Sequence, residues 1–177
     1  HPKVVAIGET GLDFHYNYSP AEDQYPSLRA HIEAARRADL PIILHCREAD
    51  TQMADLLEEE MGKGAFRPLL HCYTGGAELA RRASALGAYF SASGIITFKK
   101  AEDVRAVFRE IVPEDRIIIE TDCPYLAPVP YRGRRNEPSY LPHVLEKLCE
   151  VKGWGVEEGA ERTTQAALRL FDRISVS

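Results

Sequence analysis

The chain has 177 residues, of which 45% are apolar, and its formal net charge is −5. A chain of this length and composition can bury a core, and its length favours one domain over residues 1–177. The negative charge argues against a protein that coats nucleic acid through bulk positive charge, and no apolar run is long enough to cross a membrane.

Strand and helix signals alternate along the chain. Runs rich in β-branched residues and Leu predict strands at 4–8, 41–45, 67–71, 88–93 and 117–120. Capping patterns and Gly or Pro stops predict helices at about 20–38 (or 26–38, if the helix restarts at Pro26), 51–61, 77–86, 102–112, 139–151 and 156–171. Strict alternation of this kind predicts βαβ units, a parallel sheet and right-handed crossovers. Residues 58–60, all Glu, are expected to form a solvated helix face.

Four of the predicted strands lead into a side chain that can bind a metal. These side chains are Glu9, His45, His71 and Asp122. The carboxyl ends of the strands in a parallel α/β barrel converge, so we expect the four to meet at one site. Two imidazoles and two carboxylates form a mixed N/O set that suits Zn²⁺, Mn²⁺ or a related divalent ion better than Ca²⁺.

A metal at this site would lower the pKa of a bound water, and a nearby carboxylate could accept its proton. We predict that Asp122 is this base and that Glu9, which has two oxygens, can bridge two ions. Glu120 shares a strand face with Asp122, and we expect it to orient a ligand instead of binding the metal itself. Asp13 and Tyr16 follow the first strand, where lining the site and forming a turn are equally good interpretations.

Several residues are predicted to contact substrate. Period-two alternation places Arg47 on the strand face of His45, and Tyr73 on that of His71. Guanidinium groups match phosphate geometry, so Arg47, Arg132 and Arg134 are predicted to contact nucleic acid phosphates. For Arg135, a phosphate contact and an internal pair that braces the loop at 123–138 carry equal weight.

Six strings of the chain, in order, are GETGLDFHY, ILHCR, LLHCYTGG, SASGI, ETDCPYLAPVPYRGRRNEP and TTQAALRLF. With these strings the chain resembles the TatD-type metal-dependent deoxyribonucleases of the amidohydrolase superfamily. The resemblance implies a TIM-type (β/α)8 barrel that hydrolyses DNA phosphodiesters with 3′–5′ exonuclease character. It also implies that two divalent ions, such as Mg²⁺, Mn²⁺ or Zn²⁺, bind in the intact enzyme. By motif, their ligands would include Glu9, His45, His71 and Asp122.

The chain departs from the family pattern because it shows no H-x-H pair, which in the family supplies two more ligands. Only five of the eight barrel strands can be counted, and 177 residues fall short of the roughly 250 typical of the fold. We therefore expect the C-terminal portion of a TatD-like barrel, covering about the last five strand–helix units. Such a chain is expected to bind at most one ion tightly and to be nearly inactive alone.

Two other functions remain open at this point. A related barrel hydrolase could cleave a small ester, lactone or amide, which a dry apolar pocket would favour. A non-catalytic fragment is the other alternative, because the H-x-H ligands are absent. The expected partner is a DNA substrate, with no membrane association and no obligate protein partner. Four cysteines without C-x-x-C spacing suit a reducing compartment, and we expect a cytoplasmic protein.

Overall fold

The computed structural model describes residues 1–16 and 18–174. In this part of the chain, five strands form one parallel sheet in the order β1-β2-β3-β4-β5. The strands are β1 (Ile7–Asp13), β2 (Ile42–Arg47), β3 (Pro68–Leu70), β4 (Tyr89–Ala92) and β5 (Ile117–Ile119). Each strand pairs with the next one along the chain, so the prediction of a parallel α/β sheet is confirmed.

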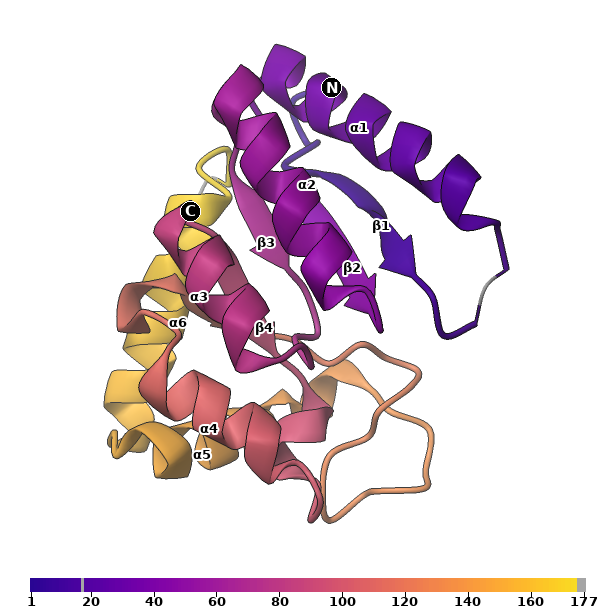
Figure 1. Cartoon of the computed structure of the whole chain (residues 1–177). Coiled ribbons are helices and arrows are strands. Elements are labelled where there is room, and N and C mark those ends of the chain that lie inside the picture. The colour runs from indigo at the N-terminus through magenta and orange to yellow at the C-terminus, as the bar shows by residue number, and fades with distance from the viewer. Residues whose placement is uncertain (17, 175–177) are drawn as a thin grey trace.

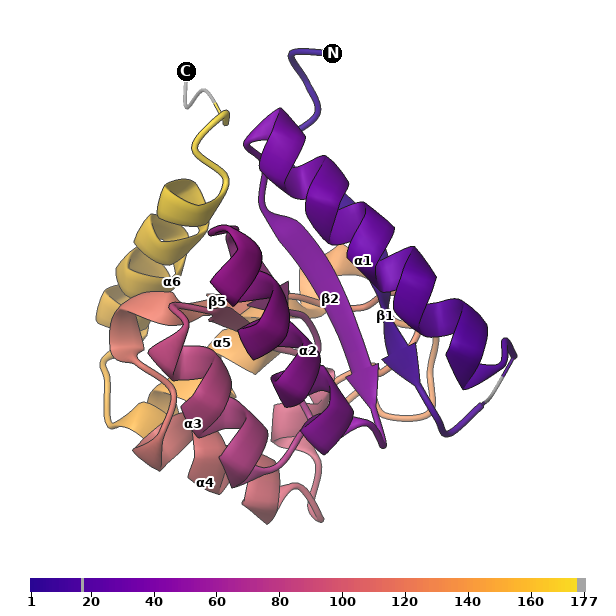
Figure 2. The ribbon, with the colours of Figure 1, turned by 45° about the horizontal axis from the view of Figure 1, so that its top comes forward.

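Helices connect the strands and cover the sheet. They are α1 (Ala21–Ala38), α2 (Asp50–Lys63), α3 (Ala77–Ala85), α4 (Glu102–Glu110), α5 (Leu141–Lys152) and α6 (Val156–Leu170). Short 3-10 turns are η1 (Gly94–Thr97), η2 (Glu114–Arg116) and η3 (Pro138–Tyr140). The helices α1 to α4 follow one another along one face of the sheet (Figure 1). Helix α1 runs beside β1 and β2 (Figure 2). Within the described residues, no helix has both the length and the apolar character needed to span a membrane.

The two faces of the sheet are buried by different helices. Leu44, Leu70 and Phe90 belong to the main core, which includes the buried residues of α1 to α4. The alternate strand residues pack instead against α6, and they are Ile43, Leu69, Tyr89 and Ile118. Successive strand side chains point to opposite faces, so α6 covers the second face near the start of the strands. Two residues further along, that second face carries His45, His71 and Glu120.

Strand β1 is longer than the sequence pattern predicts, because it continues past Glu9 to Asp13. Gly11 pairs with His45 of β2, and a Cβ at Gly11 would overlap the carbonyl oxygen of His45. The register shifts between Ile7 and Thr10, which places an irregularity at Glu9. Irregularities of this kind re-aim side chains, so Glu9 lies within the strand and still faces the site.

The expectation of a solvated face at 58–60 is wrong for Glu60, whose side chain is only 4% exposed. Helix α1 packs beside α2 and supplies Arg29 and Arg36, both of which donate to the Glu60 carboxylate. Lys63 donates to it from the next turn of α2, at 2.8 Å. We call these four residues the α1–α2 ion cluster.

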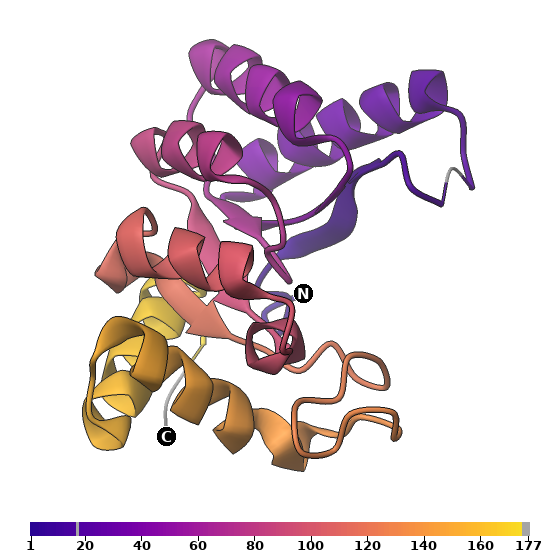
Figure 3. The ribbon, with the colours of Figure 1, turned by 60° about the horizontal axis from the view of Figure 1, so that its bottom comes forward.

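The long loop between β5 and η3, drawn in orange, lies at the end of the sheet toward which the strands run (Figure 3). The segment that directly follows β1 extends from the same end (Figure 3). Parallel α/β folds place their functional residues at this end.

Candidate metal centre

The four predicted ligands line one pocket at the carboxyl end of the sheet. We call this cavity of about 160 Å³ the histidine pocket. Its walls are Glu9, His45, Cys46, Arg47, His71, Cys72, Thr74, Ile95, Asp122 and Leu126. The convergence follows from the fold, because neighbouring strands bring residues far apart in sequence to the same edge.

Glu9 lies between the two imidazoles. Its Oε1 is 3.2 Å from Nδ1 of His45 and 2.8 Å from Nε2 of His71. One ligand atom from each of these three residues lies within 4.8 Å of the other two. Two ring nitrogens directed at one carboxylate oxygen offer the ligand types and the spacing that a divalent transition metal takes. This donor set therefore fits a metal ion.

Each imidazole has a further carboxylate on its other nitrogen. Nε2 of His45 lies 2.8 Å from Oδ2 of Asp13, and Nδ1 of His71 lies 3.4 Å from Oε1 of Glu120. Carboxylates in such positions fix the orientation of metal-binding imidazoles. Asp13 also accepts hydrogen bonds from the backbone N–H groups of His15 and Tyr16, so it both contacts His45 and shapes the turn.

A second set of potential ligands overlaps the first. His71, Glu120 and Asp122 also bring one ligand atom each to within 4.8 Å of the others. Asp122 has a φ of 56°, in the left-handed region, where the chain turns away from the line of β5. Burial raises the pKa of its carboxyl, and the nearby charge of Glu120 raises it further. Asp122 therefore holds a proton more readily than an ordinary aspartate.

Neighbouring groups also shift the pKa values of Glu120 and His71. Burial alone would raise the pKa of Glu120, but hydrogen bonds with His71 and Ser91 outweigh burial and lower it. Burial alone would lower the pKa of His71, but Glu120 and Glu9 outweigh it and raise the pKa to about 9. A metal ion and a proton therefore compete for this imidazole.

Ser91 is a functional candidate that the sequence analysis missed. Its hydroxyl donates to Oε2 of Glu120 and accepts a hydrogen bond of 2.8 Å from the backbone N–H of Cys72. Ser91 lies fully buried within β4, in the otherwise apolar run YFSA. A polar side chain in a buried strand needs a partner, and that was the available signal.

The prediction that Tyr73 contacts substrate is wrong. Its ring is only 3% exposed and packs edge-on against Phe90 and Phe108, and its hydroxyl donates to the carbonyl oxygen of Gly76 at 2.7 Å. Strand β3 ends at Leu70, and Cys72 has a φ of 44°. Because the strand geometry stops before residue 73, period-two alternation does not carry Tyr73 to the face of His71.

The predicted phosphate contacts lie around the pocket. Arg47 lines it and holds its guanidinium 5.3 Å from the ring centre of Tyr16. Arg132 lines an adjoining cavity, and Arg134 is exposed on the loop after β5. Across residues 1–16 and 18–174, Arg135 makes no ion pair with Glu137, which instead accepts from the hydroxyl of Ser139. The internal pair proposed for Arg135 is therefore wrong.

Comparisons with known proteins agree with this geometry. The profile described as TatD related DNase matches residues 1–172. The Bacillus subtilis protein named uncharacterized metal-dependent hydrolase YabD is 47% identical over 171 residues, which cover 97% of this chain and 66% of that protein. The Pantoea vagans protein named 3′-5′ ssDNA/RNA exonuclease TatD is 37% identical over 175 residues, which cover 96% of this chain and 66% of that protein.

A solved structure resembles the fold closely. The crystal structure of YJJV, a TatD homologue from Escherichia coli, has a TM-score of 0.86 and 29% identity, and the match covers 96% of this chain and 64% of that one. Structures of this family are barrels of the TIM type. The chain spans slightly less than two thirds of the length of the relatives it matches. From its profile match, its relatives and its fold, the chain belongs to the TatD related DNase family of metal-dependent hydrolases.

Proposed function

We propose that this protein is a divalent-metal-dependent phosphodiesterase that cleaves single-stranded DNA as a 3′–5′ exonuclease. The observation that carries the proposal is the convergence of His45 and His71 on one oxygen of Glu9, in a pocket that also contains Arg47. The name of the Pantoea vagans relative supports the choice of a nuclease. We further propose that residues 1–177 act as one domain.

The proposed ligands are Glu9, His45, His71 and Asp122. The cluster of Glu9, His45 and His71 would hold one divalent ion, Mg²⁺, Mn²⁺ or Zn²⁺, and the nearby carboxylate of Asp122 supports the proposal of a second ion in the intact enzyme. When bound, the metal supplies a water of lowered pKa and neutralises charge on the phosphodiester.

The residues of the chain carry out the remaining tasks. Asp122 accepts the proton of the attacking water, and its raised pKa makes it a better base than an ordinary carboxylate. Asp13 and Glu120 hold the two imidazoles in place from their outer nitrogens. Arg47 lies at the pocket wall, where its planar guanidinium can hold a phosphate by two parallel hydrogen bonds.

The lining of the pocket supports a phosphodiester substrate over a small ester, lactone or amide. Six of its ten lining residues have charged or polar side chains, and the purely hydrocarbon side chains are those of Ile95 and Leu126. A small neutral ester is recognised mostly by apolar surface with a few polar groups. The exposed cation Arg47 would have no partner on such a substrate.

The experiment measures degradation of a single-stranded oligonucleotide labelled at either end, with Mn²⁺, Mg²⁺ or Zn²⁺ and with excess chelator as the control. In the intact enzyme we expect metal-dependent shortening from the 3′ end. Thermal unfolding provides a second readout, because an ion at a hundred times its Kd stabilises the folded state by about 2.7 kcal/mol. Turnover that persists in chelator, or a protein that binds metal and cleaves only small esters, would overturn the proposal. Metal-dependent stabilisation without any turnover would favour the non-catalytic alternative.

A further inference from the structure

A second cavity adjoins the histidine pocket. We call this cavity of about 540 Å³ the lysine cavity. It is lined by Thr74, Ile95, Phe98, Lys99, Lys100, Ala101, Val104 and Arg132. Thr74 and Ile95 line both cavities, so the two lie side by side. Its volume falls within the roughly 300–1,000 Å³ of cavities that bind small organic groups.

The cations of the lysine cavity have no carboxylate partner among residues 1–16 and 18–174. Lys99, Lys100 and Arg132 are all exposed there. The neighbouring cations of α4 differ, because Arg105 and Arg109 both pair with Glu102. Cations that remain available beside a metal centre favour an anionic ligand, even though the whole chain is acidic.

The cavity also offers a flat surface for stacking. The guanidinium carbon of Arg132 lies 3.7 Å from the centre of the Phe98 ring. Stacking on the ring fixes the guanidinium plane, and nucleobases stack on planes of this kind in single-stranded complexes. Phosphates and a base could therefore be bound by the same small group of residues.

Hydrogen bonds hold this surface in position. Arg105 donates to the carbonyl oxygens of Ile96 and Phe98, at 3.0 and 2.7 Å. The hydroxyl oxygen of Thr97, at the end of η1, accepts a hydrogen bond of 2.9 Å from the backbone N–H of Val129. These contacts tie η1 to the loop that carries Arg132, so little ordering is required when a ligand binds.

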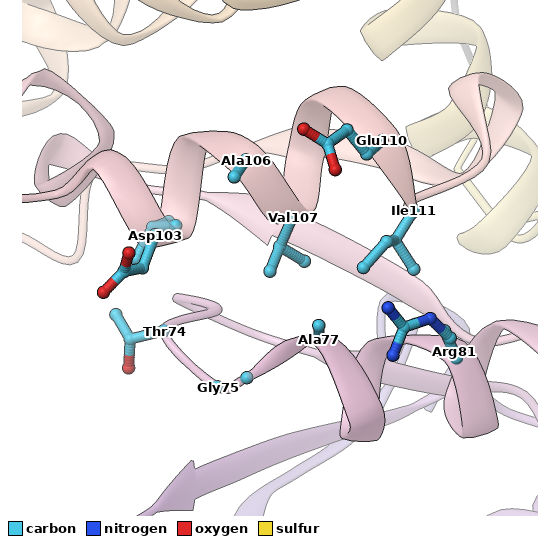
Figure 4. Close-up of a pocket in the computed structure, with 11 residues that line it drawn as sticks. Thr74, Gly75, Ala77, Arg81, Asp103, Ala106, Val107, Glu110 and Ile111 are labelled. Atoms are coloured by element: carbon cyan, nitrogen blue, oxygen red, sulfur yellow. The ribbon is translucent and has the colours of Figure 1, made fainter.

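The cavity between α3 and α4 offers a contrast. It has a volume of about 410 Å³ and also reaches Thr74. Asp103 lies at its Thr74 end, and Glu110 lies on α4, across the cavity from Arg81 of α3 (Figure 4). Two carboxylates against one guanidinium disfavour an anionic chain there. Thr74 lines both this cavity and the lysine cavity, and of these two the lysine cavity has the positive charge that attracts a nucleic acid strand.

We propose that the lysine cavity is a nucleotide subsite for a single strand whose scissile phosphodiester lies in the histidine pocket. Lys99 and Lys100 contact phosphates, and a base stacks on the guanidinium plane of Arg132. This inference rests on the proposed function, because it takes the substrate to be a nucleic acid strand. It adds two residues just after η1, Lys99 and Lys100, to the arginines already predicted to contact phosphates.

The test uses the double variant Lys99→Ala/Lys100→Ala and the matched control Lys3→Ala/Lys147→Ala, which removes the same charge elsewhere. Anisotropy of a labelled oligothymidylate in chelator measures binding over a range of salt. We expect the cavity variant to bind about tenfold more weakly than the wild type. Its salt slope should fall by about 1.4, because each phosphate contact on a single strand contributes about 0.7. The control should bind like the wild type.

A second variant tests the stacking surface. Arg132→Lys keeps the charge and removes the planar group, so we expect weaker binding with little change in the salt slope. Two results together would overturn the subsite. The lysine variant would bind with the affinity and salt slope of the control, and Arg132→Lys would bind with wild-type affinity. Hydrolysis of bis(p-nitrophenyl) phosphate by the wild type tests the metal centre separately, because this small diester needs only the histidine pocket. If that hydrolysis fails, the binding measurements still decide whether the lysine cavity holds a strand.

Discussion

Charged side chains are arranged in opposite ways in the α1–α2 ion cluster and in the histidine pocket. In the cluster, Glu60 is surrounded by Arg29, Arg36 and Lys63. In the pocket, carboxylates lie near one another, and their partners are imidazoles instead of permanent cations. The cluster therefore satisfies its charges within the protein. The pocket leaves an excess of acidic groups that a bound cation would neutralise.

The difference shows in the direction of the pKa shifts. For Glu60, burial acts to raise the pKa, but hydrogen bonds from the three cations outweigh burial and lower it. For Asp122, burial and the neighbouring Glu120 act together and raise the pKa. Opposite charges placed around a carboxylate stabilise the fold, whereas like charges placed beside it prepare the group for proton transfer.

The largest expected effect is a loss of turnover from a substitution in the histidine pocket. Asp122→Asn keeps the size of the side chain and removes its basicity, so we expect kcat on single-stranded DNA to fall at least about 100-fold. Circular dichroism should be unchanged. Glu161→Gln is the matched control, since it removes one exposed carboxylate from α6 and should leave kcat as in the wild type. Wild-type turnover in Asp122→Asn would remove the role assigned to this residue.

The next largest expected effect is on metal affinity. It concerns the carboxylates of Asp13 and Glu120, which contact the second ring nitrogen of each imidazole. Asp13→Asn weakens the contact that orients His45, and losses of this kind typically reduce metal affinity by about 10–100-fold. Calorimetric titration with Mn²⁺ or Zn²⁺ measures the change without relying on activity. Asp23→Asn, on the exposed start of α1, serves as the control. Equal affinities in the two variants would mean that Asp13 only shapes the turn.

The sequence predicted one side of the comparison better than the other. The sequence placed Glu9, His45, His71 and Asp122 in one pocket because each follows a strand signal within a few residues, which is local information. Glu60 was missed because its burial depends on α1 packing over α2, and no local pattern distinguishes it from Glu59. Charge runs on helices therefore remain ambiguous until the neighbouring helix is placed.

Tyr73 and the lysine cavity show two further limits. Alternation predicts a side-chain direction only while the chain stays extended, and the positive φ of Cys72 ends that condition without a glycine to signal it. Lys99 and Arg132 meet only because η1 packs against the loop after β5. The strand-end chemistry could be predicted from the sequence, but contacts between loops could not.

A smaller effect is expected on the cluster side, where stability and not activity should respond. Glu60→Gln leaves the buried parts of Arg36 and Arg29 without their carboxylate, and we expect a loss of about 1–3 kcal/mol in the free energy of unfolding. Glu59→Gln removes an exposed partner of Arg29 and should cost less free energy of unfolding than Glu60→Gln, because water screens an exposed ion pair. Urea unfolding at neutral pH compares the two. Equal losses would mean that burial does not distinguish these neighbouring glutamates.

The smallest expected effect is the pH dependence of the stability difference between the wild type and Glu60→Gln. The folded-state pKa of Glu60 lies below its ordinary value of 4.5, so its ionised form stabilises the protein fully above that value. This contribution is lost as the pH falls from about 4.5 through the lowered pKa of the folded state. The stability gap between the wild type and Glu60→Gln should therefore be constant near neutral pH and narrow as the solution is acidified below 4.5. Urea titrations of both proteins over this interval measure the gap. A gap that widens on acidification would show that hydrogen bonding to the protonated carboxyl, and not its charge, holds α1 against α2.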